Sequence, residues 1–168
     1  MTTAIKVPVR PVISRTSEGA YRLTQTMQVL KPLEEVFEFF SDARNLNLIT
    51  PPWLQFEILT EGDIDMREGM LLDYRLKLHG VPVRWTSEIT IWDPPRLFVD
   101  TQARGPYKEW HHLHRLTAID SSTTEVSDQV DYKVPGGRLI NRLFVKRDLE
   151  AIFKYRAGRT VELLGGTP

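Results

Sequence analysis

The sequence predicts an α+β fold in which a curved, seven-stranded antiparallel sheet wraps around one long C-terminal helix, with two short helices after the first strand. Three observations predict it. Apolar and polar residues alternate in seven segments, which is the period of β-strands. The connections within the later series of six segments are too short to hold crossover helices, so neighbouring strands should be antiparallel. A helical apolar pattern over 138–164 closes the chain.

The first strand is expected over 20–29, where the alternation is regular. At Pro32 the apolar pattern changes from the period of a strand to that of a helix. Proline suits the first turn of a helix, and Glu34 and Glu35 suit the positive end of the helix dipole. A second short helix should follow Asp42, a capping residue, and end before Pro51. The first strand is therefore followed by two short helices.

Six further strands are expected in the middle of the chain, each bounded by turn-forming residues such as glycine and proline. They cover residues 54–61, 69–79, 82–93, 96–105, 107–118 and 124–134. A Pro-Gly-Gly turn at 135–137 ends the series and leads into the long helix. We therefore expect residues 20–164 to form one domain, preceded by an extension over 1–19 and followed by a tail over 165–168. The extension is expected either to be loose or to lie along a sheet edge.

Composition excludes several functions. Lys plus Arg number 22 and Asp plus Glu number 22, so the chain lacks the basic excess of a nucleic-acid-binding protein. The absence of cysteine excludes disulfides, zinc–thiolate sites, iron–sulfur clusters and cysteine nucleophiles. No apolar run is long enough for a signal peptide or a membrane span, so a cytoplasmic location is expected.

Charge is distributed unevenly along the chain. Residues 138–168 hold seven Lys and Arg against three Asp and Glu, a net charge of +4. This basic helix could pair with the acidic body of the protein or make weak contact with an anionic membrane surface, and the sequence leaves both open.

The face of the sheet that should be apolar also carries polar residues. His112 and His114 lie two apart on one strand and share a face, and Asp128 falls among the apolar residues of the last strand. Asp100 and Gln102 belong to the same face if Phe98 points inward. They leave the site if Leu97 points inward instead. Burial of such groups without partners costs a few kcal/mol each, so they should pair with one another or line a cavity.

Four sequence motifs carry a resemblance to a known superfamily: Thr50-Pro51-Pro52-Trp53, Asp73-Tyr74-Arg75-Leu76, Gly105-Pro106-Tyr107 followed by Trp110-His111-His112-Leu113-His114, and Arg147-Asp148-Leu149 with Phe153-Lys154-Tyr155-Arg156. In these motifs and its layout, the chain resembles the helix-grip, or START-like (SRPBCC), superfamily, and within it the bacterial cyclase/dehydrase-like ligand-binding proteins. The resemblance implies a sheet that grips the C-terminal helix, with an apolar cavity between them.

We therefore expect the protein to bind a hydrophobic or aromatic small molecule, of lipid, polyketide or quinone type, in that cavity. Aromatic residues would supply contact area, while His and Asp would orient the ligand. The expected ligand-binding residues are Tyr74, Trp85, Phe98, Asp100, Gln102, Trp110, His112, His114, Asp128 and Tyr132. Arg147 and Arg156 of the basic helix are expected near the cavity rim.

Two other functions stay open. The first is a polyketide cyclase/dehydratase-like enzyme in which acid–base chemistry falls to His112, His114, Asp100 or Asp128. The second is a membrane-associated lipid or quinone chaperone that works through the basic helix. Binding is favoured over catalysis because the sequence shows no nucleophile and no cofactor motif. The spacing of the two histidines would suit a metal, and Asp100 or Asp128 on a neighbouring strand could complete a site of two histidines and one carboxylate. Only the two histidines are well spaced as ligands, so we expect no metal and no cofactor.

Overall fold

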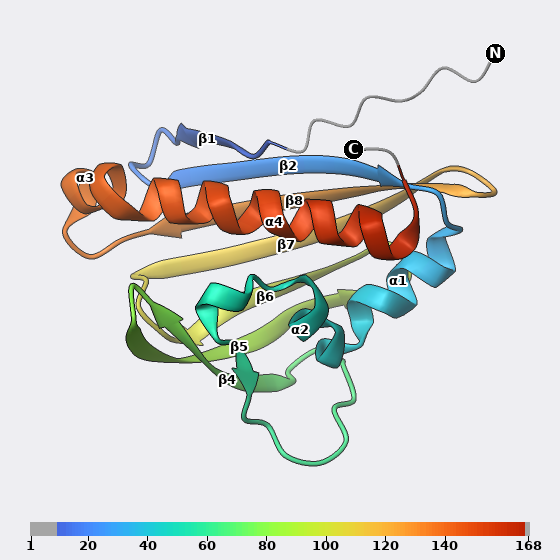
Figure 1. Cartoon of the computed structure of the whole chain (residues 1–168), viewed down its shortest axis with the longest axis horizontal. Coiled ribbons are helices and arrows are strands. Elements are labelled where there is room, and N and C mark those ends of the chain that lie inside the picture. Colours follow the sequence, from blue (N-terminus) through green and yellow to red (C-terminus); the bar gives the residue numbers. More distant parts are fainter. Residues whose placement is uncertain (1–9, 167–168) are drawn as a thin grey trace.

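The computed structural model describes residues 10–166. Eight antiparallel strands form one sheet in the order β1-β2-β8-β7-β6-β5-β4-β3 (Figure 1). The strands are β1 Val12–Arg15, β2 Tyr21–Val29, β3 Glu57–Ile58, β4 Leu71–Leu78, β5 Val81–Asp93, β6 Leu97–Arg104, β7 Glu109–Asp120 and β8 Thr123–Lys133. The predicted α+β class and the antiparallel sheet are confirmed.

The helices lie in two groups. After β2 come α1 Leu33–Ser41, a 3-10 turn Ala43–Asn45, α2 Leu46–Ile49 and a second 3-10 turn Pro52–Leu54. The C-terminal group holds α3 Gly137–Ile140, a π-helical turn Asn141–Val145 and α4 Lys146–Leu164. The long helix α4 lies over the sheet alongside β2 and β8, with α1 and α2 beside it (Figure 1). Over residues 10–166, no helix combines the length and apolar character needed to cross a membrane.

The strand count of seven was wrong by one. Residues 12–15, placed in the N-terminal extension by the sequence, form β1 at the sheet edge, where Val12 pairs with Thr24 and Arg15 with Tyr21. A tight turn connects β1 to β2, and in it the Thr16 N–H donates a hydrogen bond to the Ala20 carbonyl at 2.9 Å. A strand of four residues offers too few alternations to be recognised from sequence. Residues 1–9 of the expected extension, and residues 167–168 of the tail, lie outside the described residues.

The sequence predicted one uninterrupted C-terminal helix, but the structure shows an interruption. The helix widens into a π turn over Asn141–Val145 before α4 begins. Asn141 is buried there, and its Oδ1 accepts a hydrogen bond from Tyr132 Oη at 3.0 Å. The π turn therefore coincides with the point where the helix is tied to β8, and an apolar periodicity does not reveal such a polar contact.

The core fixes α4 against the sheet. Leu149, Phe153, Ala157 and Val161 recur every four residues along one side of the helix and are each at most 4% exposed. Leu149 and Phe153 pack with apolar residues of β2 and β8, whereas Ala157 and Val161 pack in a second cluster nearer α1. Because α4 is held along its length, the space between its N-terminal half and the outer strands is well defined.

Candidate functional site

A cavity of about 160 Å³ lies between the sheet, α4 and the segment that holds α2. One buried water needs roughly 10–15 Å³, so the cavity has room for a small organic molecule. Most of its wall is apolar or aromatic: Phe40, Ala43, Leu46, Leu54, Phe56, Met66, Leu72, Tyr74, Leu76, Leu78, Trp85, Ile89, Phe98, Tyr107, Trp110, Leu149, Ile152 and Phe153. The polar part of the wall is Thr50, Ser87, Asp100, His112, His114 and Arg156.

Three neighbouring strands bring the central polar residues together. His112 and His114 lie two apart on β7, so both side chains project to the same face. Asp100 on β6 is opposite His112, and Asp128 on β8 is opposite His114. The shortest contacts run diagonally: His112 Nε2 lies 2.9 Å from Asp128 Oδ1, and His114 Nε2 lies 2.9 Å from Asp100 Oδ2. We call these four residues the His–Asp quartet.

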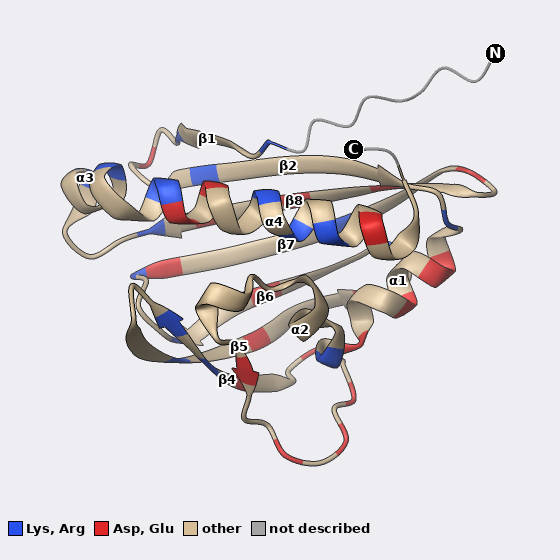
Figure 2. Cartoon of the chain, viewed as in Figure 1, with Lys and Arg blue, Asp and Glu red and all other residues tan. Residues whose placement is uncertain are grey.

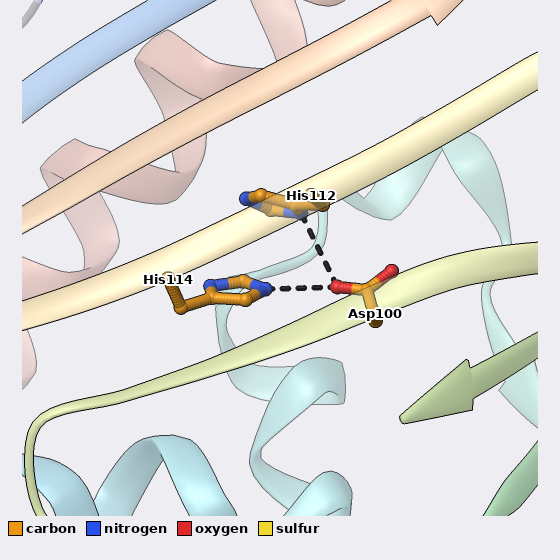
Figure 3. Close-up of side chains that lie close together, drawn as sticks. All are labelled: Asp100, His112 and His114. Carbon is orange, nitrogen blue, oxygen red and sulfur yellow. Dashed lines mark hydrogen bonds and ion pairs between the residues drawn. The ribbon is translucent and has the colours of Figure 1, made fainter. Parts of the chain in front are cut away.

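The second nitrogen of each imidazole faces the other carboxylate. His112 Nδ1 lies 3.4 Å from Asp100 Oδ2 (Figure 3). His114 Nδ1 lies 3.1 Å from Asp128 Oδ1, but without the alignment of a hydrogen bond. Asp100 lines the cavity, whereas Asp128 is 4% exposed and is absent from the cavity wall. Each histidine is thus placed between one carboxylate at the cavity and one behind it.

The pKa values of the two carboxyl groups are lowered. Burial acts to raise the pKa of Asp128, but the hydrogen bond with His112 and the attraction of both imidazoles outweigh burial and hold the pKa well below its ordinary value. Burial opposes the shift at Asp100 too. There the hydrogen bond with His114 and the electrostatic attraction of His112, His114 and Arg156 lower the pKa. Both groups are therefore carboxylates at neutral pH.

The two imidazoles differ in their pKa shifts. Burial, and next the neighbouring charge of His114, lowers the pKa of His112. Burial also disfavours the charged form of His114, but its hydrogen bond to Asp100 and the nearby charges of Asp100 and Asp128 raise its pKa above the ordinary value. The quartet therefore holds two carboxylates, a neutral His112 and a His114 that keeps its proton more readily.

A hydroxyl group links the quartet to the aromatic wall. Ser87 Oγ lies 3.1 Å from Tyr74 Oη, accepts a hydrogen bond from Trp85 Nε1 at 3.1 Å, and donates to Asp100 Oδ1 at 3.5 Å. Burial raises the pKa of Tyr74 far above its ordinary value, so its hydroxyl stays protonated and available as a donor. Ser87 was missed by the sequence analysis. Its position midway between Trp85 and Ile89, both on the inward face of β5, is the signal that could have found it.

Seven of the ten residues expected at the site lie on the cavity wall: Tyr74, Trp85, Phe98, Asp100, Trp110, His112 and His114. Phe98 is 4% exposed and faces the cavity, which places Asp100 on the same wall. Of the two arginines expected at the rim, Arg156 lines the cavity, whereas Arg147 is exposed and does not.

The other three expected residues lie outside the cavity wall for identifiable reasons. The amide of Gln102 donates to the Tyr107 carbonyl at 2.8 Å and accepts from the Tyr107 N–H at 3.1 Å, so it braces the β6–β7 turn. Asp128 lies behind the histidines. Tyr132 directs its hydroxyl to Asn141 in the π turn. Period-two alternation assigns these residues to a face but does not say how deep each side chain lies.

A curved antiparallel sheet closed by a C-terminal helix over an apolar cavity defines a START-like protein of the helix-grip fold. A family model described as polyketide cyclase/dehydrase and lipid transport matches residues 29–153. The chain belongs to this family.

Solved structures show the same fold at low sequence identity. The Zhui aromatase/cyclase from a Streptomyces species is 21% identical, with a TM-score of 0.60 over 87% of this chain and 98% of that one. A START superfamily protein from Mycobacterium smegmatis is 15% identical, with a TM-score of 0.64 over 86% and 99%. Protein Ms6760 from the same organism is 18% identical, with a TM-score of 0.65 over 91% and 96%. No curated protein matches this chain.

Proposed function

We propose that this protein binds an apolar or aromatic small molecule, of lipid, polyketide or quinone type, in the cavity beside α4. The observation that carries the proposal is a buried polar cluster on the wall of an otherwise apolar cavity. Apolar walls favour binding by about 25 cal/mol for each Å² of apolar surface removed from water. A few convergent polar groups then fix the orientation of the ligand.

The chemistry of the polar wall indicates which end of the ligand it would hold. Arg156 carries N–H donors and Tyr74 an O–H donor, both on the cavity wall. They suit a carbonyl, enol or carboxylate oxygen at the polar end of an apolar molecule. The family described as polyketide cyclase/dehydrase and lipid transport supports a ligand of this kind.

Filling the cavity tests this proposal. Ala43 is 2% exposed and lines the cavity, so Ala43→Leu extends a side chain into the space that a ligand would occupy. Ala103→Leu makes the same change at an exposed position of β6 outside the wall. A fluorescent apolar probe should bind the wild type and Ala103→Leu equally, and Ala43→Leu at least tenfold more weakly. Equal probe affinity in all three folded proteins would contradict binding in this cavity.

A second candidate function is a cyclase/dehydratase-like reaction on a poly-β-ketone. The placement of two imidazoles and Asp100 on the wall of a ligand-sized cavity favours it, because general acid–base catalysis needs such groups within hydrogen-bond reach of the substrate. In this case His112→Gln or His114→Gln abolishes turnover while apolar-probe binding stays nearly unchanged. An absence of any turnover by the wild type on poly-β-ketone substrates rejects it.

A third candidate is a carrier that collects its ligand at an anionic membrane. Four apolar residues of the α3 and π-turn segment are exposed: Leu139 by 64%, Ile140 by 36%, Leu143 by 51% and Phe144 by 48%. Lys and Arg gather on the same segment and on α4, whereas Asp and Glu gather on α1 and the loop before β4 (Figure 2). A hollow lined by Ile140 also includes Tyr107 and Ile152, which line the main cavity, so this end offers an entry path.

A further inference from the structure

We propose that Asp100, His112 and His114 form a binding site for a divalent transition-metal ion on the cavity wall. One ligand atom from each residue lies within 4.8 Å of the others. Figure 3 shows Asp100 on β6 facing both imidazoles of β7. The proposal goes beyond the binding of an organic molecule and does not depend on it.

The positions of the ring nitrogens favour a cation at this point. Asp128 Oδ1 lies 2.9 Å from His112 Nε2 and can accept its N–H. It also lies 3.1 Å from His114 Nδ1, where its negative charge favours a proton although the two atoms are not aligned for a hydrogen bond. The remaining nitrogens, His112 Nδ1 and His114 Nε2, then direct lone pairs toward Asp100 Oδ2, at 3.4 and 2.9 Å.

Three electron-pair donors that converge in a buried place repel one another unless a positive charge lies among them. A single proton on His114 Nε2 bridges one of the two contacts with Asp100. His112 Nδ1 is then left facing the carboxylate at 3.4 Å, with its own proton engaged toward Asp128. A divalent cation satisfies all three donors together. Metal–ligand bonds of about 2.0–2.2 Å place neighbouring ligand atoms roughly 3 Å apart, close to the two distances to Asp100.

Asp128 has the position of a supporting carboxylate. Metal-bound histidines almost always donate the other ring N–H to a carboxylate or carbonyl, which fixes the tautomer and the ring orientation. Here the buried carboxylate of Asp128 lies beside the second ring nitrogen of both histidines. Metal binding at His114 Nε2 puts the ring proton on Nδ1, a buried atom that has no hydrogen-bond partner in the structure, and directs it toward Asp128. Asp128 is thus a positioning residue.

The ligand types select the class of metal. Two neutral imidazoles and one carboxylate suit Zn²⁺, Fe²⁺, Co²⁺ or Mn²⁺. Three protein ligands leave coordination positions open toward the cavity. The sequence-based expectation of no metal rested on finding only two well-spaced ligands. The register of β6 against β7, which places Asp100 opposite His112, supplies the third.

Titration with the metal alone tests the site. Full-length protein is stripped with a chelator, and Co²⁺ binding is followed by visible absorption, with Zn²⁺ as competitor. We expect one Co²⁺ per chain, and a loss of affinity of at least 100-fold in Asp100→Asn, His112→Gln and His114→Gln. Asp128→Asn should weaken binding about 10- to 100-fold. The control is His111→Gln, because His111 lies on the same strand with its side chain exposed. The Co²⁺ affinity of this variant should equal that of the wild type.

Two results overturn the proposal: no saturable binding of Co²⁺, Zn²⁺ or Mn²⁺ by the folded wild type, or affinity that survives in the ligand variants. Circular dichroism and the apolar probe report on folding. If a histidine variant does not fold, the Co²⁺ affinity of the isosteric variant Asp100→Asn tests the proposal instead. Probe binding by the chelator-treated protein separates the two proposals, because the cavity should accept the probe whether or not the metal site exists.

Discussion

The imidazole rings of His112 and His114 lie with their centroids 3.7 Å apart and their planes at 35°. Alternation along β7 places both on the face that packs toward α4, where the neighbouring strands contribute mainly apolar side chains. Carboxylates from β6 and β8 hold this pair on either side. The three proposed roles, which are ligand orientation, acid–base chemistry and metal binding, therefore all fall on the same few residues.

Removal of the buried carboxylate should destabilise the fold. Asp128→Ala removes the buried carboxylate that both imidazoles contact, so we expect the free energy of unfolding to fall by about 3–5 kcal/mol. Urea denaturation measures it. Asp131→Ala, three residues further along β8, breaks a partly exposed ion pair with Arg22 and should cost no more than about 1 kcal/mol. Similar small changes in both variants would show that the quartet contributes little to stability.

The contact between β8 and the π turn should matter for stability but not for binding. Tyr132→Phe removes the donor to Asn141 Oδ1 and leaves a buried acceptor unpaired, which costs about 1–3 kcal/mol. Apolar-probe affinity should stay unchanged, because neither residue lines the cavity. A large loss of probe affinity in a folded Tyr132→Phe protein would show that the π turn controls access to the cavity.

Arg156 should select ligands with an acidic end. Its guanidinium lies on the cavity wall and helps to lower the pKa of Asp100. We expect Arg156→Met to weaken binding of a fatty acid about tenfold, as loss of a charge-assisted hydrogen bond would, and to leave binding of the matching fatty alcohol unchanged. Calorimetric titration measures both. Arg147→Met is the control, because Arg147 is exposed outside the cavity. Equal losses for acid and alcohol would contradict this role.

The exposed apolar residues of α3 and the π turn should determine whether the protein contacts a membrane. Vesicles with anionic phosphatidylserine should co-float with the wild type at low salt and release it at high salt, because each basic residue near such a surface contributes about 1 kcal/mol. Phe144→Glu should abolish flotation. Leu163→Glu changes an apolar residue of similar exposure at the far end of α4 and should have no effect. A wild type that stays unbound at low salt would reject the carrier hypothesis.

Much of the fold could be predicted because the alternation of apolar and polar residues is regular in the long strands. The same alternation placed His112, His114 and Asp128 on the inward face. It could not choose between Phe98 and Leu97, because both are apolar and a shift by one residue reverses every side chain of β6. The pairing of Asp100 with His112 depends on strand register, which the sequence alone does not fix.

Other features escaped prediction because they depend on single contacts. Ser87 is a small polar residue between apolar neighbours, and only its three partners show that it belongs to the site. Gln102 satisfied the period-two rule, but its amide is bound to the backbone of Tyr107. The π turn and β1 depend on a buried amide and a four-residue edge pairing, neither of which changes the apolar periodicity.

Native mass spectrometry of the protein purified from its own host tests the central claim, that the cavity binds a small apolar molecule, most directly. We predict one bound organic molecule per chain in the wild type and in Ala103→Leu, and its loss in Ala43→Leu, where the cavity is filled. A bare chain mass in the wild type, even after incubation with a total lipid extract of the host, would contradict the claim. Equal retention of the bound mass in Ala43→Leu would do the same.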